Sequence, residues 1–258
     1  MASHRATVRL YSAWFCPYAQ RAWMVVNNIG IDYNLIESLE IDSASATHGY
    51  KKNPRLLEIN KKGLVPTLEI FNNAVSGQTQ TLDIDGQPPM VITESIDVMK
   101  FVYEHVGRGV ENTEVEEAIQ FDRIVCSPFY RCLMKQIKEE QANGWKDLLS
   151  GLECFSNGVR PGKYYKSDTP SIVDFTVFPW AFRLYVLEKF RGFTLDQNLL
   201  WVKNFMFWKE RMENEIEGVK ETLPDKNKLL KSYERYADAS AKSLVGQAVN
   251  AGKEAHEI

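Results

Sequence analysis

The sequence predicts two domains, an α/β domain with its elements in the order βαβ-ββα and, after it, an all-helical domain. Two observations predict this fold class. Short alternating segments take turns with helical segments up to about residue 105, and helical periodicity dominates from residue 112 onward. Between them, Gly107-Arg108-Gly109 interrupts the pattern. We therefore expect an N-terminal domain over residues 1–106, a linker over 107–112 and a helical domain over 113–258.

The first part of the α/β domain is typical of a strand, a tight turn and a helix. Residues 7–12 alternate as a strand does, and residues 17–29 carry apolar side chains at helical spacing. Pro17 suits the first turn of that helix, and Gly30 ends it. The other expected elements are a strand over 33–37, a short helical segment over 53–60, strands over 67–71 and 90–92, a loop or hairpin over 72–89, and a helix from about 94 to 105.

The second domain is expected to be helical throughout. Ser171 and Asp174 form the S-x-x-D pattern that begins a helix, because the serine hydroxyl accepts a backbone N–H there, and we interpret both as folding residues. From about residue 238 the chain has few large apolar residues, which predicts a weakly packed helix or a mobile tail. The expected helices cover residues 112–143, 145–155, 171–190, 198–217 and 220–236.

Composition and charge argue against several classes of function. The chain has 258 residues, 44% of them hydrophobic and 25% charged, which suffices to bury a sizeable core. A formal net charge of -3 argues against nucleic acid as a partner. The N-terminus has no signal-peptide core, and no stretch reaches about 18 uninterrupted apolar residues. We therefore expect no membrane partner and a cytoplasmic location.

One cysteine lies where a helix is expected to begin. Pro17 takes the predicted first helical position, which places Cys16 at the N-cap, beside backbone N–H groups and the positive end of the helix dipole. Such a position can lower the pKa of a cysteine from about 8.5 into a range of roughly 3.5 to 7.5, and the thiolate is the nucleophile. The alternative is a small buried cysteine that merely packs. The strand, Cys-Pro and helix context favours the reactive thiol.

This thiol has no second cysteine near it in the sequence. Ala19 stands where a dithiol oxidoreductase has its second cysteine, so a mixed disulfide formed at Cys16 needs an external thiol to resolve it. Glutathione is the abundant cytosolic candidate, and we expect it as a co-substrate. The other cysteines, Cys126, Cys132 and Cys154, fall in the helical half and are interpreted as packing residues. No metal site is expected.

Two further segments have the chemistry to hold a small peptide. The bond before Pro66, if cis, would turn the backbone so that Val65 offers its N–H and C=O to an extended peptide beside Cys16. At the start of the helix near residue 94, the Ser95 hydroxyl and nearby N–H groups suit a carboxylate, and Glu94 suits an ammonium group. Taken alone, Glu94 and Ser95 also fit an ordinary helix cap.

Taken in chain order, these segments resemble a known family, the omega-class glutathione transferases and the related lambda class of plants. The region from Ser171 to Leu184 resembles that family's N-capping box and the helix after it, so the resemblance covers most of residues 7 to about 215, and the tail is similar to fungal members. It implies a thioredoxin-like N-terminal domain plus an all-α C-terminal domain, the glutathione transferase fold. The segments that carry it are Phe15-Cys16-Pro17-Tyr18-Ala19-Gln20-Arg21, Asn53-Pro54, Gly63-Leu64-Val65-Pro66-Thr67-Leu68 and Glu94-Ser95.

The resemblance also implies an activity and a set of site residues. It implies a homodimer that reduces mixed disulfides with glutathione, and often dehydroascorbate or other small oxidised or electrophilic substrates, with little conjugating activity. Cys16 would be the nucleophile. The glutathione contacts that it implies are Tyr18, Lys52, Val65, Pro66, Glu94 and Ser95, and the lining of a second, substrate-facing pocket that it implies is Pro17, Trp180 and Arg183.

Two other functions are compatible with the same residues. The first is a non-catalytic binding module, because this fold also serves in translation-factor subunits and intracellular chloride-channel proteins. The second is the reductive removal of glutathione from quinones, which substrate screening separates from disulfide reduction.

Overall fold

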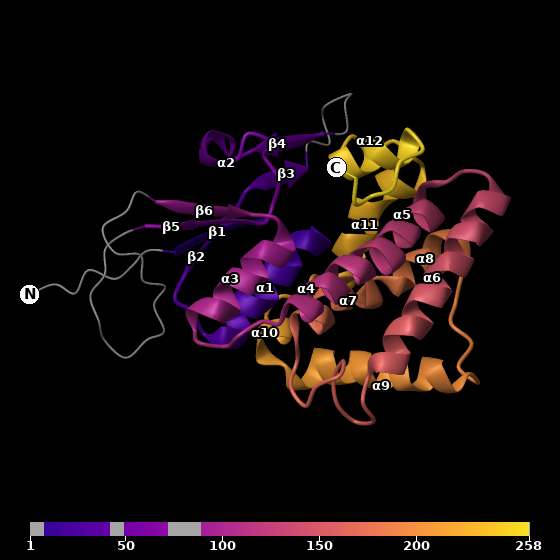
Figure 1. The fold of residues 1–258 in the computed structure, drawn as a ribbon. Coiled ribbons are helices and arrows are strands. Elements are labelled where there is room, and N and C mark those ends of the chain that lie inside the picture. The colour runs from indigo at the N-terminus through magenta and orange to yellow at the C-terminus, as the bar shows by residue number, and fades with distance from the viewer. Residues whose placement is uncertain (1–7, 42–48, 72–88, 258) are drawn as a thin grey trace, which may run out of the picture. The chain divides into compact units, whose positions relative to one another are not determined.

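The computed structural model describes residues 8–41, 49–71 and 89–257, and these residues form two compact units (Figure 1). The α/β unit holds the described parts of 1–40, 51–115 and 216–223. The helical unit holds the described parts of 41–50, 116–215 and 224–258. The loop or hairpin predicted over residues 72–89 lies, apart from residue 89, outside the described residues.

A four-stranded sheet forms the centre of the α/β unit, in the order β2-β1-β5-β6. Strand β1 runs parallel to β2 and antiparallel to β5, and β5 runs antiparallel to β6. Tyr11 of β1 pairs with Thr67 of β5, which pairs with Thr93 of β6. The ends of β1 and β6 and the start of β5 therefore share one edge of the sheet. The strands are β1 (Val8–Ser12), β2 (Asn34–Glu37), β5 (Thr67–Ile70) and β6 (Met90–Thr93), and a separate two-stranded sheet, which the sequence did not predict, joins β3 (Leu39–Ile41) and β4 (Tyr50–Lys52).

The two faces of this sheet have different chemistry because side chains alternate along a strand. Leu10 and Leu68 are fully buried and share one face, where helices α1 and α3 pack side by side. Arg9, Tyr11 and Glu69 share the other face by register, and Figure 1 shows helix α2 on that side. The helices of this unit are α1 (Pro17–Ile29), α2 (Pro54–Ile59), α3 (Ser95–His105) and α10 (Glu217–Lys220).

Helix α10 belongs to the α/β unit although the sequence analysis placed it in the helical domain. It packs on α1, and a Cβ atom at Gly218 would lie 2.5 Å from the backbone nitrogen of Asn28. The Gln20 side chain of α1 donates a hydrogen bond to the carbonyl of Thr222 just after α10 (3.2 Å). Glycine at position 218 therefore allows a backbone approach that any larger residue would block.

The second half of the chain is helical, as predicted, but its helices break at different places. The structure ends one helix at Met134 and begins the next at Lys138, whereas we predicted a continuous helix over 112–143. A predicted break near Gly144 is wrong, because Gly144 lies inside a helix where a Cβ atom would come within 2.7 Å of the Cys132 backbone nitrogen. The elements are α4 (Asn112–Phe121), a π-helical turn η1 (Asp122–Cys126), α5 (Ser127–Met134), α6 (Lys138–Gly158), α7 (Ile172–Phe182), α8 (Leu184–Arg191), α9 (Leu200–Glu215), α11 (Lys226–Ala237) and α12 (Leu244–Asn250).

The C-terminal stretch contains a helix that is more closely packed than the weakly packed helix or mobile tail expected from about residue 238. Helix α12 packs on α5 and buries Val245 and Val249. Beyond it Ala255 is fully buried, and the His256 ring nitrogen lies 2.7 Å from the Ser127 hydroxyl. The stretch is thus anchored by small apolar side chains, whose low hydrophobicity led us to consider a mobile tail. Among the described residues, no helix is long and apolar enough to cross a membrane.

Candidate active site

Cys16 lies at the N-cap of α1, as the sequence predicted, at the edge of the sheet where β1 ends. Its backbone is extended (φ -80°, ψ 118°), and Pro17 takes the first turn of the helix. The backbone N–H of Cys16 donates to the Ala13 carbonyl (2.9 Å), and its carbonyl accepts from Gln20 (3.0 Å). The residue is half-buried. The sulfur accepts no capping hydrogen bond from the described residues of α1, but its place at the N-terminus of α1 puts it near the positive end of the helix dipole, a position that favours a thiolate.

Val65, two residues before β5, lies close to Cys16. The Val65–Pro66 peptide bond is cis, and the Cys16 sulfur lies 4.0 Å from the Val65 carbonyl oxygen. Asn60 shapes this loop, because its side chain donates to the Leu64 carbonyl (3.2 Å) and accepts from the backbone N–H of Lys62 (3.1 Å). The structure therefore brings together the thiol and the peptide segment that the sequence proposed as its neighbour.

Glu94 and Ser95 complete the same edge of the sheet, at the start of α3. Glu94 is exposed and has a left-handed backbone (φ 67°), a conformation that non-glycine residues rarely adopt. Ser95 is buried, and its hydroxyl accepts a hydrogen bond from Arg21 (3.1 Å). Backbone outliers of this kind concentrate at ligand sites. The helix start thus presents an exposed carboxylate beside a serine whose hydroxyl is held by an arginine.

Arg21 is a site residue that the sequence analysis did not single out. It is almost fully buried in α1, and its guanidinium also lies 4.9 Å from the centre of the Tyr18 ring. Arg21 therefore connects Tyr18 of α1 to Ser95 of α3, two of the predicted contacts. Its signal in the sequence is an arginine on the helix that follows Cys16, three residues before the apolar run Met24-Val25-Val26, where a buried charge needs partners.

Lys52 lies beside the same loop at the end of β4. Its ammonium group donates to the Lys62 carbonyl (2.8 Å), and burial lowers the pKa of Lys52. Its side chain lies against Gly63, where a Cβ atom would come within 2.7 Å of the lysine Cδ. Gly63 also has a left-handed backbone (φ 60°). Lys52 is therefore placed next to the segment that ends at Val65.

Trp180 and Arg183 lie elsewhere, in the core of the helical unit. Both have no exposed surface, and Arg183 donates to the Pro179 carbonyl one turn earlier (2.8 Å). A side chain without exposed surface packs and does not line an open pocket, so the structure lends no support to their predicted place in a substrate pocket. Pro17, the third residue of that prediction, is buried at the start of α1.

The remaining cysteines differ in exposure. Cys126 and Cys132 are fully buried, and burial raises the pKa of Cys132 to about 12, as expected of packing residues. Cys154 is exposed on α6, so its interpretation as a packing residue was wrong. Within the described part of the chain, no three His, Cys, Asp or Glu residues form a group that could hold a metal ion.

Most of the described α/β unit is similar to a known protein family. Residues 15–105 match the family described as "Glutathione S-transferase, N-terminal domain". These residues are therefore similar to the N-terminal domain of glutathione S-transferases. The matched span begins beside Cys16 and includes Val65, Glu94 and Ser95, so it contains the whole candidate site of the α/β unit. Enzymes of the glutathione S-transferase family use glutathione as a co-substrate.

Individual relatives extend this similarity over most of the chain. A pyrimidodiazepine synthase of Drosophila melanogaster is 26% identical over 81% of this chain and 77% of its own length. The chloroplastic glutathione S-transferase L2 of Arabidopsis thaliana is 26% identical over 92% of this chain and 73% of its own.

Solved glutathione transferases share the fold of both units. The glutathione transferase Omega 3C of Trametes versicolor matches with a TM-score of 0.68 and 25% identity, over 92% of each chain. A rice glutathione transferase solved in complex with glutathione matches with a TM-score of 0.69 over 90% of this chain and 96% of its own, at 16% identity. The chain therefore has the glutathione transferase fold, a thioredoxin-like domain followed by a mostly helical part, as the sequence predicted.

Proposed function

We propose that this protein is a glutathione-dependent thiol transferase of the omega type, with Cys16 as its nucleophile. The observation that carries the proposal is the position of Cys16, a half-buried thiol at the N-terminus of α1 and 4.0 Å from the carbonyl of Val65. Similarity to an omega-class structure at 25% identity supports the class. The position three residues after Cys16 holds Ala19, so Cys16 cannot form a disulfide with a residue at that position.

The reaction that this site supports is a pair of thiol–disulfide exchanges. The Cys16 thiolate attacks the glutathione sulfur of a mixed disulfide, which forms a Cys16–glutathione disulfide and releases the substrate as a thiolate that takes up a proton. A second glutathione thiolate attacks that disulfide, which regenerates Cys16 and releases oxidised glutathione. The net reaction oxidises one free glutathione for each mixed disulfide reduced, because the other half of the oxidised glutathione comes from the substrate. Reduction of one dehydroascorbate would instead consume two free glutathione molecules, which leave as one molecule of oxidised glutathione.

Each proposed glutathione contact has a chemical counterpart in γ-Glu-Cys-Gly. Val65 would offer its backbone N–H and C=O to the cysteinyl part, and Pro66 follows it directly in the chain. Glu94 is exposed for the γ-glutamyl ammonium group, and Ser95 with the N–H groups of the α3 start suits the neighbouring carboxylate. Lys52 supplies a cation for the glycyl carboxylate. Tyr18 packs under Arg21 beside Cys16.

The decisive experiment compares Cys16→Ser with the matched control Cys154→Ser, which alters the exposed cysteine of α6. Reduction of a glutathionylated peptide should fall to the uncatalysed rate in Cys16→Ser and remain unchanged in Cys154→Ser. Alkylation of Cys16 should show a midpoint well below the value of about 8.5 for free cysteine, and glutathione should slow it. Activity retained in Cys16→Ser would refute the proposal, and absence of protection by glutathione would favour a non-catalytic module.

We further propose that the enzyme is a homodimer in the cytoplasm, as its resemblance to omega-class members implies. Size-exclusion chromatography with light scattering tests the first statement, and a mass of 29.6 kDa in solution, the mass of one chain, would contradict it. Screening glutathionyl-quinones beside disulfides and dehydroascorbate would show which oxidised substrate the site prefers.

A further inference from the structure

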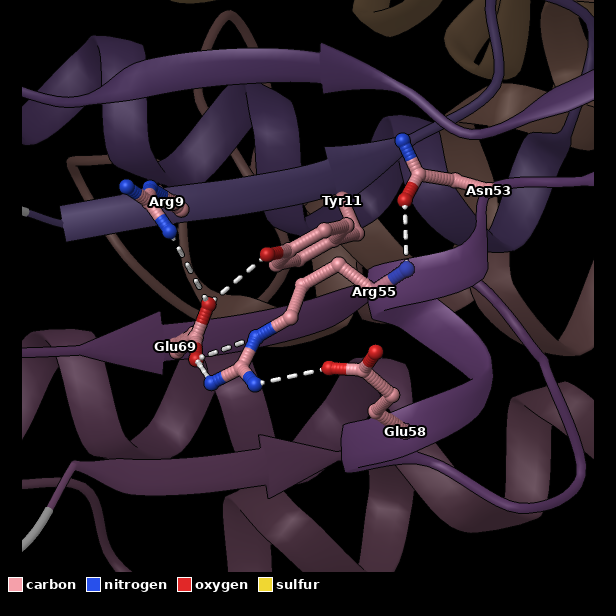
Figure 2. Close-up of polar contacts among 6 residues, drawn as sticks. All are labelled: Arg9, Tyr11, Asn53, Arg55, Glu58 and Glu69. Atoms are coloured by element: carbon pink, nitrogen blue, oxygen red, sulfur yellow. Dashed lines mark hydrogen bonds and ion pairs between the residues drawn. The ribbon is translucent and has the colours of Figure 1, made fainter.

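A buried carboxylate on the sheet forms hydrogen bonds and ion pairs with polar and charged side chains from β1 and α2. Glu69, in the middle of β5, has no exposed surface. One of its oxygens accepts from the Tyr11 hydroxyl (2.7 Å) and lies 3.7 Å from a guanidinium nitrogen of Arg9. The other accepts from two nitrogens of Arg55, with the Nε contact at 3.1 Å and a shorter Nη2 contact. Figure 2 shows both arginines and the tyrosine converging on this one side chain.

A glutamate is a costly choice at this position. Removing a carboxylate from water is unfavourable, and an apolar side chain of similar size often gives equal or greater stability where a buried ion pair stands. The residues next to it, Leu68 and Ile70, are apolar and fully buried. Stability alone therefore explains poorly why a glutamate occupies position 69. The positions of the groups that Glu69 holds explain it better.

The group that depends most on Glu69 is helix α2. Among its six described residues α2 buries Leu56, whereas Leu57 on the same short helix is 41% exposed. Apolar packing thus holds α2 weakly. Arg55 projects from α2 toward the sheet, and the two contacts of its guanidinium to Glu69 anchor the helix to β5. Its third contact, to Glu58 (2.9 Å), stays within α2 and lies at the surface.

Both ends of α2 continue into residues proposed to bind glutathione. Asn53 caps the helix by accepting from the Arg55 backbone N–H (2.9 Å), and Lys52 directly precedes it. Asn60 follows the helix and shapes the loop that ends at Val65. Because Lys52 also donates to the carbonyl of Lys62 in that loop, a displacement of α2 would move both glutathione contacts together.

We propose that Glu69 and Arg55 are positioning residues for glutathione, which act by anchoring α2 and the 60–65 loop to the sheet. The inference rests on the proposed function, because it concerns the site that binds glutathione. Neither residue is expected to touch the tripeptide. Cys16 stands on α1 and meets the 60–65 loop at the Val65 carbonyl, 4.0 Å from its sulfur, so we expect thiol reactivity to depend much less on this pair than glutathione affinity does.

The test measures glutathione affinity and thiol reactivity separately in Glu69→Gln, Arg55→Met and Arg55→Lys, with Glu58→Gln as matched control. We expect the dissociation constant for glutathione, measured from its protection of Cys16 against alkylation, to rise roughly 10- to 100-fold in Glu69→Gln and Arg55→Met. The alkylation rate without glutathione should stay within about twofold of wild type. Arg55→Lys should rescue part of the affinity, because lysine keeps the charge but not the paired contact. Glu58→Gln should bind as wild type does.

Two further measurements separate positioning from a general structural role. First, the Michaelis constant for glutathione should rise in the single variants while turnover at saturating glutathione is kept. Second, the double variant Arg55→Met/Glu69→Gln should bind glutathione no more weakly than either single variant, because the two residues act through one contact. Arg55 is 43% exposed, so its variants remain informative if Glu69→Gln fails to fold. Wild-type affinity in Arg55→Met, or an equal loss of Cys16 reactivity, would overturn the inference. Failure of glutathione to protect the wild type would instead overturn the proposed function.

Discussion

Within the described residues, each of the two units buries one carboxylate, and the polar groups around the two carboxylates differ. Glu69 of the α/β unit is surrounded by two arginines and a tyrosine hydroxyl. Asp174 of the helical unit has neutral donors, the backbone and hydroxyl of Ser171, the backbone N–H of Tyr165 and the indole N–H of Trp208. Burial raises the pKa of Asp174 to about 6, even though these hydrogen bonds favour its charged form.

This difference indicates that the two buried acids have different structural roles. Asp174 accepts hydrogen bonds from two buried groups, the Tyr165 N–H and the Trp208 indole, and from the half-buried Ser171, so it fixes the start of α7 and the packing around Trp208. Glu69 binds the half-exposed Arg55 on a weakly buried helix, so it determines where a surface segment lies. We therefore expect losses at Asp174 to appear in global stability and losses at Glu69 to appear in ligand affinity.

The largest stability effect is expected from Asp174→Ala. The variant leaves the buried N–H groups of Trp208 and Tyr165 without their acceptor and breaks the capping box of α7. Each unsatisfied buried donor costs about 1–3 kcal/mol, so the free energy of unfolding should fall by roughly 3–5 kcal/mol. Urea denaturation followed by tryptophan fluorescence measures it. A loss below about 1 kcal/mol would show that these contacts are not important for the core.

The free energy of unfolding should change with pH because Asp174 titrates. Its pKa is higher in the folded state, about 6, than the ordinary 3.8, so the folded state binds more protons between these values. The contribution of Asp174 to stability is therefore present below pH 4 and is lost as the pH rises to about 6, by up to roughly 3 kcal/mol. Subtracting the profile of Asp174→Asn, which cannot titrate, isolates this change. A difference profile that rises with pH would have the wrong sign.

A smaller effect is expected from Tyr11→Phe at the other acid. The change removes one donor from Glu69 and leaves both arginines in place, so the free energy of unfolding should fall by about 1–2 kcal/mol. Because Arg55 contacts the other carboxylate oxygen, glutathione affinity should change less than twofold. A loss of affinity as large as in Glu69→Gln would show that the tyrosine, and not the arginine, fixes α2.

The smallest effects should come from the two helix caps, Ser171 of α7 and Asn53 of α2. Each side chain accepts one backbone N–H, so replacement by alanine should cost about 1 kcal/mol of helix stability. In Ser171→Ala this loss should lower the denaturation midpoint. In Asn53→Ala it should appear instead as faster amide exchange within α2, because that helix opens locally. Equal shifts of the midpoint in both variants would contradict the comparison.

Structural features that depend on residues close together in the sequence could be predicted. Cys16, Pro17 and the α1 helix follow from neighbouring residues, and the capping box of Ser171 and Asp174 spans four positions. Contacts between distant residues could not be predicted in this way. The Arg21–Ser95 bond joins residues 74 positions apart, and no local pattern pairs Arg55 with Glu69 among the many charges of the chain.

Glycines show a second reason for error, because the same residue serves opposite purposes. Gly30 ends α1 in the left-handed conformation, as predicted. Gly144 also resembles a helix end in the sequence, but it continues α6 and lets that helix approach the backbone of α5. A Cβ atom at Gly30 would meet nothing within 4 Å, whereas one at Gly144 would meet the backbone of α5. Choosing between them requires the partner helix, which the local sequence does not identify.

The return of the chain to the α/β unit at residues 216–223 matters for anyone exchanging halves between related enzymes. A chimera spliced after residue 115 would keep the thiol and the sheet but inherit a foreign α10 opposite Asn28. Unless the donor protein also has a glycine where this chain has Gly218, the two backbones would collide. The thiol-bearing half is therefore inherited as two pieces of sequence, and recombination between homologues must transfer both.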